Sequence, residues 1–145
     1  MLKFTLPYRL LSFYPPFLGT GIWVKNATKY GFRVTMLDLW FNRNVYGTHF
    51  GGSLYAMCDP FFILILHRNL GNDYIYWDKA AHIEYLKPAK GHVTAMFEIS
   101  PEAIESIKNE MEFEKRKSFK FKTFIIDKKG QKVASVEKEI YIKVK

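Results

Sequence analysis

The stretch NVYGTHFGGSLYAMCDP, residues 44–60, joins a glycine-rich turn to the beginning of a predicted helix. Apolar side chains recur at helical spacing from there on, which predicts a helix over 51–69, on the pattern Leu54, Met57, Phe61 and Ile65. The segment is apolar almost all round, as expected for a helix that is covered on every side. We therefore expect one buried helix near the centre of the domain.

The pair Gly51-Gly52 stands where the loop becomes the helix. The first N–H groups of a helix have no partners within it, and the helix dipole makes that end positive. Glycines also let another group approach the backbone closely. The pair is a candidate donor site for an anion, or for a carbonyl oxygen that gains charge during a reaction. The structural alternative is that the glycines only make the turn.

Asp59 follows Gly52 by seven residues, about two helical turns, so both share one face of the predicted helix. A carboxylate in an apolar helix is costly unless it is paired or functional, and pairing with Lys79 or a backbone donor is the structural alternative. The two residues are roughly 10 Å apart along the axis, which is too far to serve one reacting group. A two-fold dimer with antiparallel helices would bring Asp59 of one chain beside Gly52 of the other.

Two neighbours of the acid bear on its role. Pro60 removes one helical hydrogen bond, so we expect a kink that either aims the Asp59 side chain or only shapes the helix. Cys58 is the single cysteine, and we interpret it as a small buried apolar residue. One cysteine excludes an intrachain disulfide, and no Cys and His cluster has metal-site spacing, so we expect no metal and a cytoplasmic location.

Strand patterns flank the predicted helix on both sides. Before it we predict strands over 21–24 and 32–40, with Gly31 as the positive-φ residue of the turn between them. After it, the alternation from Tyr74 to Leu86 predicts a strand with one face toward the helix. That face would hold Ile75, Trp77, Lys79, Ala81, Ile83 and Tyr85.

The last third of the chain completes the predicted domain. We predict a strand over 92–99 and a helix that begins at the N-cap Ser100 and ends near Glu114. Strands over 119–126 and 133–144 form a closing hairpin. The order of elements predicts an α+β domain in which one antiparallel β-sheet wraps around a long central α-helix.

Composition and charge agree with one folded domain, residues 1–145, because 48 % of the residues are hydrophobic. Residues 1–18 are predicted to be an N-terminal amphipathic arm or helix, since prolines and Arg9 interrupt any signal-like apolar run. The net charge of +8 falls largely in the last third. It fits either a solvated strand face or attraction of phosphate groups, and no nucleic-acid motif or membrane span accompanies it.

Together, Asn44, the Gly47-Thr48-His49 turn, Gly51-Gly52 and Asp59 resemble the hotdog-fold acyl-CoA thioesterases. The resemblance covers nearly the whole chain and is nearest to a branch known as a domain of unknown function. It implies a hotdog fold, with sheets paired edge to edge in a homodimer or a dimer of dimers. The implied partner is acyl-CoA or another acyl thioester, with coenzyme A present only as part of the substrate and no further cofactor.

The same resemblance implies roles for individual residues. Asp59 would act on the thioester as general base or nucleophile, and the Gly52 N–H of the partner chain would polarise the carbonyl. Asn44 would orient the water or the thioester, and His49 would help hold the site. The substrate-binding candidates are Thr48, Gly51, Lys79 and Trp77. The sequence departs from the family pattern in two places, since Phe50 separates His49 from the glycine pair and Pro60 follows the acid.

Other functions fit the same residues. A non-catalytic acyl or lipid binder on this fold is favoured by the two departures. An enoyl-thioester hydratase or dehydratase would need a His paired with an acid, and His49 with Asp59 is the candidate pair. Nucleic-acid binding through the C-terminal lysines is the weakest alternative, since it has charge but no motif.

Overall fold

The computed structural model describes residues 8–145. The chain begins with the 3-10 helix η1 (Tyr8–Phe13) and the helix α1 (Pro15–Thr20). The strands are β1 (Ile22–Ala27), β2 (Gly31–Met36), β3 (Tyr74–Tyr85), β4 (Val93–Glu98), β5 (Arg116–Ile126) and β6 (Lys132–Val144). Between β2 and β3 lie η2 (Trp40–Asn42), α2 (Gly51–Ala56) and α3 (Phe61–Leu70), and between β4 and β5 lies α4 (Pro101–Phe113).

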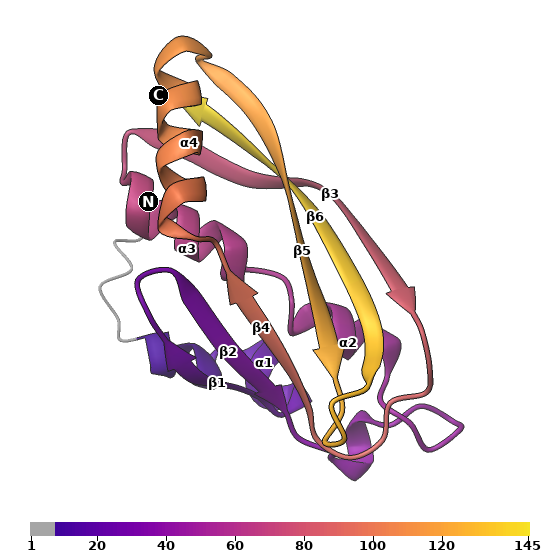
Figure 1. Cartoon of the computed structure of the whole chain (residues 1–145). Helices are drawn as coiled ribbons and strands as arrows, with labels where there is room; N and C mark the ends of the chain where they lie inside the picture. The colour runs from indigo at the N-terminus through magenta and orange to yellow at the C-terminus, as the bar shows by residue number, and fades with distance from the viewer. Residues whose placement is uncertain (1–7) are drawn as a thin grey trace.

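The strands form one antiparallel sheet in the order β1-β2-β4-β5-β6-β3. The long strands β3, β5 and β6 curve past α2 and α3, as Figure 1 shows. On the buried side Phe61 and Phe62 of α3 contact Phe97 of β4, with ring centroids 4.9 and 5.3 Å apart. Burial of such large apolar side chains is the main stabilisation of the domain. The predicted α+β arrangement, one sheet around a central helical segment, is confirmed.

The predicted helix over 51–69 is interrupted. Pro60 occupies the N-cap position of α3, and the turn before it separates α3 from α2. In that turn the N–H groups of Cys58 and Asp59 donate to carbonyls three residues back rather than four. Pro60 has no N–H and its ring crowds the preceding turn, so the α-helical ladder stops there. The kink expected at Pro60 is a complete break, and Asp59 lies in it.

A β-bulge in β3 decides which of its side chains face the helices. The pairing of β3 with β6 shifts register between Asp78 and Ala80. The extra residue reverses the alternation of side chains, so the inward set is Tyr74, Tyr76 and Asp78 before the bulge, and Ile83 and Tyr85 after it. The predicted inward face is therefore wrong before the bulge, where Trp77 and Lys79 point outward, and right after it.

Two expectations about the first strands are also wrong. The strand predicted over 32–40 ends at Met36. Gly31 does not have a positive φ; it lies at the start of β2, where a Cβ would come within 2.7 Å of the Phe97 carbonyl oxygen of β4. The glycine is required by the close approach of two strands and not by the turn.

The described part of the predicted N-terminal arm consists of η1 and α1, packed on β1. The buried hydroxyl of Ser12 accepts a hydrogen bond from the N–H of Val24, at 3.0 Å, and Phe17 is buried in the core. Residues 1–7 of the arm lie outside the described residues. None of the helices in residues 8–145 is both long enough and apolar enough to cross a membrane.

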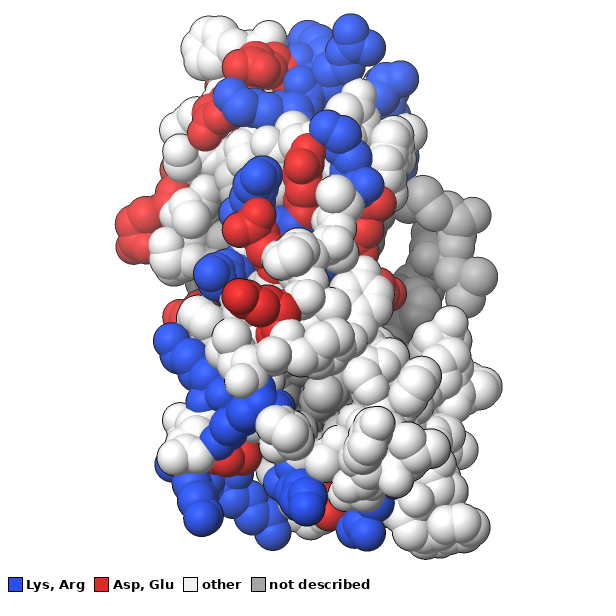
Figure 2. Space-filling view, turned by 90° about the vertical axis from the view of Figure 1, so that its right-hand side faces the viewer, with Lys and Arg blue, Asp and Glu red and all other residues white. Residues whose placement is uncertain are grey.

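The C-terminal elements agree with the prediction. Ser100 caps α4 by accepting the N–H of Ala103 at 3.2 Å, and β5 and β6 form the closing hairpin. On the sheet face seen in Figure 2, basic and acidic side chains alternate. Lys79 of β3 and Lys120 of β5 pair with glutamates of β6, at 2.8 and 3.6 Å. For Lys120, one of the basic residues of the last third, the explanation as a solvated strand face is supported.

Candidate functional site

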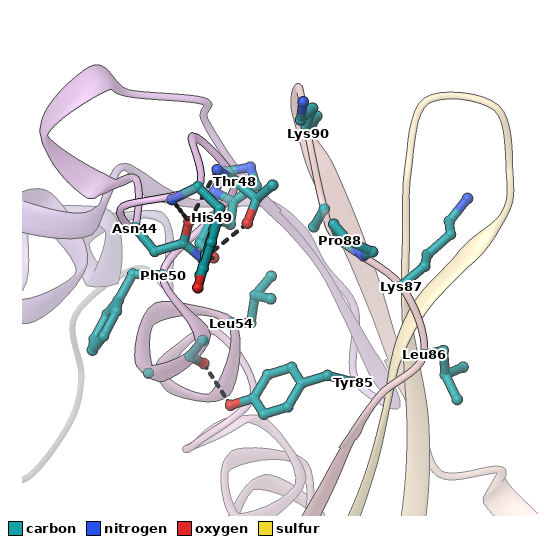
Figure 3. A pocket seen from close by; sticks show the side chains of 14 residues that line it. Asn44, Thr48, His49, Phe50, Leu54, Tyr85, Leu86, Lys87, Pro88 and Lys90 are labelled. Carbon is teal, nitrogen blue, oxygen red and sulfur yellow. Dashed lines mark hydrogen bonds between the residues drawn. The ribbon is translucent and has the colours of Figure 1, made fainter.

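A cavity of about 790 Å³ opens at the start of α2. Its walls come from three places: the loop over 44–50, the first turn of α2, and the chain over 85–90 that follows β3. Figure 3 shows Leu54 and Tyr85 beside this space, with the amine of Lys90 directed away from it. A volume of this size suits a small-molecule ligand. The cavity includes the predicted site residues Asn44, Thr48, His49, Gly51 and Gly52.

Asn44 organises the loop that forms one wall of the cavity. Its amide nitrogen donates to the hydroxyl of Thr48 at 2.9 Å, and its side-chain oxygen accepts the N–H groups of Tyr46 and Thr48 at 3.0 and 3.2 Å. The positive φ of Gly47 completes this tight turn. The polar atoms of Asn44 are thus engaged within the loop, and its predicted action on water or thioester remains a prediction.

His49 ties this loop to the opposite wall. Its side chain is 3 % exposed, and Nε2 lies 2.6 Å from the carbonyl oxygen of Gly91. A carbonyl only accepts, so Nε2 must carry the proton. The other ring nitrogen, Nδ1, is buried and has no hydrogen-bond partner among the described residues. Despite the inserted Phe50, His49 therefore remains in the cavity wall, and its Nδ1 is a free acceptor when the ring is neutral.

The glycine pair forms the first two residues of α2. No described residue accepts a hydrogen bond from the N–H of Gly51 or of Gly52. A Cβ at Gly52 would meet the Phe50 ring at 2.5 Å, and one at Gly51 would meet the Tyr85 hydroxyl at 3.0 Å. The absence of side chains at both positions therefore leaves room for these two rings. The N–H groups remain available to a ligand, as predicted for a donor site.

Asp59 does not line this cavity. It lies in the break between α2 and α3, and its side chain is 56 % exposed. Its Oδ1 accepts from the ammonium of Lys138 on β6 at 3.3 Å, and that ammonium also contacts Asp78 of β3 at 2.8 Å and the hydroxyl of Tyr55 at 3.2 Å. We call Asp59, Asp78, Lys138 and Tyr55 the ionic cluster.

Lys138 is the buried centre of the ionic cluster, with a side chain that is 1 % exposed. Burial lowers the pKa of Lys138, but the bonds and charges of Asp78 and Asp59 outweigh it, so the pKa lies above its ordinary value. Burial raises the pKa of Asp78 despite the contact with Lys138, and Oδ1 of this carboxylate has no described partner. Burial also raises the pKa of the neighbouring Cys58 thiol to about 12, which excludes a thiolate nucleophile near neutral pH.

Asp59 pairs with Lys138 and not with Lys79, the lysine that the sequence analysis proposed. Lys79 is the extra residue of the bulge and points away from the helices, and its ammonium pairs with Glu139 instead. Trp77 lies on the same outward face and packs on Tyr141, with ring centroids 4.5 Å apart. Within one chain neither residue contributes to the cavity.

The sequence prediction missed Lys138, Asp78 and Tyr85 as site residues. A signal for Lys138 was present: it alternates with Val136, Ile140 and Ile142, all buried, so the period of β6 places a lysine on an apolar face. Asp78 had no such signal, because only the bulge turns it inward. Within residues 8–145 no group of three or more His, Cys, Asp or Glu side chains is placed to hold a metal ion.

Solved structures share this architecture at low sequence identity. A probable thioesterase of unknown function from Pseudomonas aeruginosa superposes with a TM-score of 0.84 at 18 % identity, over 97 % of each chain. A thioesterase from Haemophilus influenzae gives 0.71 at 14 % identity, over 99 % of this chain and 93 % of the other. The PaaI protein of the Escherichia coli phenylacetic acid degradation operon gives 0.64 at 15 % identity, over 92 % of each chain.

The sheet wrapped around α2 and α3 is a hotdog fold, the architecture that these solved structures share. The chain belongs to the family described as a domain of unknown function, DUF4442, whose profile matches residues 6–142. No curated protein matches the chain significantly.

Proposed function

We propose that this protein hydrolyses an acyl thioester, with coenzyme A as the expected thiol, in a site built from two copies of the chain. The observation that carries the proposal is the separation of two complementary parts. The cavity holds the free N–H groups of Gly51 and Gly52 but no carboxylate, whereas Asp59 presents a half-exposed carboxylate outside the cavity. Each part supplies what the other lacks.

The edge of the sheet supports the pairing of two copies. β3 is the last strand of the sheet, and no described strand pairs with its outer edge. Its exposed Ile75 and Trp77 lie along that strand. An unpaired strand edge with apolar side chains is a surface that a second sheet can cover. Antiparallel pairing there would carry the Asp59 of one copy toward the Gly52 of the other.

The proposed reaction is water attack on the thioester carbonyl. Asp59 takes a proton from water through Oδ2 while the water oxygen bonds to the carbonyl carbon. The resulting oxyanion accepts the N–H of Gly52 of the other copy. The carbon–sulfur bond then breaks, and the thiolate leaves and takes up the proton from Asp59. The products are a carboxylic acid and a free thiol.

The test is thiol release from a panel of acyl-CoA substrates by the wild-type protein and by Asp59→Asn. We expect hydrolysis by the wild type and a fall in kcat of about 10²-fold or more in the variant, because the amide takes up no proton. Asp73→Asn changes an exposed acid in the turn between α3 and β3; it is the matched control and should leave kcat unchanged. Equal rates for Asp59→Asn and the wild type would refute the role of this acid.

A non-catalytic acyl binder is the second candidate, favoured by one observation. Oδ1 of Asp59 is already held by Lys138, as in a structural ion pair. This candidate predicts that an acyl-CoA raises the melting temperature equally in the wild type and in Asp59→Asn, with no thiol release in either. A hydratase lacks comparable support, because His49 and Asp59 have separate partners and share no contact in one chain.

A further inference from the structure

Two tyrosines of β3 bond to the two ends of the helical segment. The hydroxyl of Tyr85 donates to the carbonyl oxygen of Gly51 at 2.9 Å, where α2 begins. The hydroxyl of Tyr76 donates to the carbonyl oxygen of Gly71 at 2.8 Å, directly after α3 ends. The contacts are chemically alike, and they differ in which peptide group they reach.

The Tyr85 contact reaches the peptide group that joins Gly51 to Gly52. A trans peptide is planar, so its C=O and its N–H point in opposite directions. Whatever fixes the Gly51 carbonyl therefore fixes the direction of the Gly52 N–H as well. A donor on the carbonyl also polarises the peptide and strengthens the N–H as a hydrogen-bond donor.

The glycines allow this arrangement. A Cβ at Gly51 would lie 3.0 Å from the Tyr85 hydroxyl oxygen and 3.1 Å from its Cζ, so a side chain would push the phenol away from the carbonyl. The bulge between Asp78 and Ala80 supplies the other condition, because without it Tyr85 would fall on the outward face of the sheet. Figure 3 shows the phenol reaching across the cavity mouth to α2.

An ordinary helical role does not account for the contact. In an α-helix the carbonyl of the first residue receives the N–H four residues later, so the Gly51 carbonyl has a partner within α2 without Tyr85. The phenol is a second donor to one oxygen. Tyr85 is 52 % exposed, so water would solvate its hydroxyl if the contact were absent. Burial therefore does not oblige this hydroxyl to bond to the Gly51 carbonyl.

We propose that Tyr85 is a positioning residue for the oxyanion donor: its hydroxyl orients and polarises the Gly51–Gly52 peptide so that the Gly52 N–H meets the charge of the reacting carbonyl. The inference rests on the proposed hydrolysis and adds a residue to that site. Tyr85 acts through the peptide and does not itself touch the substrate.

The experiment compares Tyr85→Phe with Tyr76→Phe. Both variants lose one hydroxyl from the same strand and one bond to a glycine carbonyl, so Tyr76→Phe is a matched control. We expect Tyr85→Phe to lower kcat roughly 3- to 10-fold with KM unchanged, less than the 10²- to 10³-fold lost with a donor itself. Tyr76→Phe should leave kcat unchanged and lower only thermal stability, because its hydroxyl is partly buried.

A second measurement does not depend on turnover. In the ¹H–¹⁵N spectrum of the intact protein, the Gly52 amide proton should move upfield in Tyr85→Phe, as expected for a weaker donor, and should not move in Tyr76→Phe. A wild-type protein that releases no thiol would refute the proposed hydrolysis. Full kcat in Tyr85→Phe, or a Gly52 amide resonance that does not move, would overturn this inference alone.

Discussion

The two halves of the candidate site are built in opposite ways. The cavity at Gly51 and Gly52 has room for a ligand and free backbone donors, and its wall is held by hydrogen bonds of Asn44 and His49 to neutral partners. The residues of the ionic cluster do not line this cavity, and they are held together by the buried ammonium of Lys138. The difference teaches that one chain keeps its free backbone donors apart from its half-exposed carboxylate, which the proposed hydrolysis uses as oxyanion donor and as base.

This separation has an electrostatic advantage. A carboxylate beside the Gly52 N–H would occupy the donor itself and repel an oxyanion, since like charges in a desolvated site disfavour one another. With Asp59 set on Lys138, in the break between α2 and α3, the cavity of the same chain stays free of negative side chains. Two copies can then combine the halves without either half blocking the other.

The largest effect is expected at the ionic cluster. Lys138→Met should lower the free energy of unfolding by ~3–5 kcal/mol, because it leaves the buried side of Asp78 without a counter-charge. Urea unfolding at pH 7 measures this loss of unfolding free energy. The double variant Lys138→Met/Asp78→Leu should recover much of the loss, since an apolar pair replaces the ion pair.

Lys79→Met is the control for that experiment, because Lys79 also pairs with a glutamate of the sheet but on the exposed face. It should change the free energy of unfolding by no more than about 0.5–1 kcal/mol. Equal losses in Lys138→Met and Lys79→Met would show that the ionic cluster is not the structural centre described here.

A smaller effect is expected at the cavity wall. His49→Ala removes the donor to the Gly91 carbonyl and should cost about 1–3 kcal/mol, because a partly buried acceptor loses its partner. Chemical denaturation checks it, with the exposed His82→Ala as the control. A loss of thiol release without any loss of stability would instead assign His49 to the chemistry.

The smallest effect is a dependence on alkaline pH. The pKa of Lys138 is raised in the folded protein, so its contribution to stability is complete below the unfolded value, about 10.4, and is lost as the pH rises through the folded value. The gap in unfolding free energy between the wild type and Lys138→Met should therefore narrow above about pH 10.4. Urea unfolding from pH 8 to 11 measures this gap, and a constant gap would contradict the assigned pairing.

The sequence predicted the cavity half better than the acidic half, for a physical reason. The glycine turn and the start of α2 depend on neighbours in the chain, so local rules marked Gly51 and Gly52 as candidate donors, and the family resemblance added Asn44 and His49. The partner of Asp59 is set by a contact between residues 59 and 138, which no local rule reaches. The buried face of β6 did mark Lys138, but nothing in that pattern named the acid that it meets.

The choice of Lys79 failed for a narrower reason. Alternation in a strand predicts faces only while the register holds, and one extra residue between Asp78 and Ala80 reverses it. The bulge leaves no mark in composition, since Lys79 and its alanine neighbours fit an ordinary strand. The same bulge is why the sequence did not predict that Asp78 faces the helices. Tyr85 follows the bulge, and its predicted inward position is correct.

The place of β6 in the sheet also sets the order in which the domain can assemble. β3 pairs along its whole length with a strand that begins 47 residues after β3 ends and is the last element of the chain. During synthesis the N-terminal parts emerge first, so Asp59 and Asp78 leave the ribosome well before Lys138. Until residue 138 arrives, a nascent chain carries both acids without their cation. Closure of the sheet over the helices is thus a late and non-local step, of the kind that slows folding.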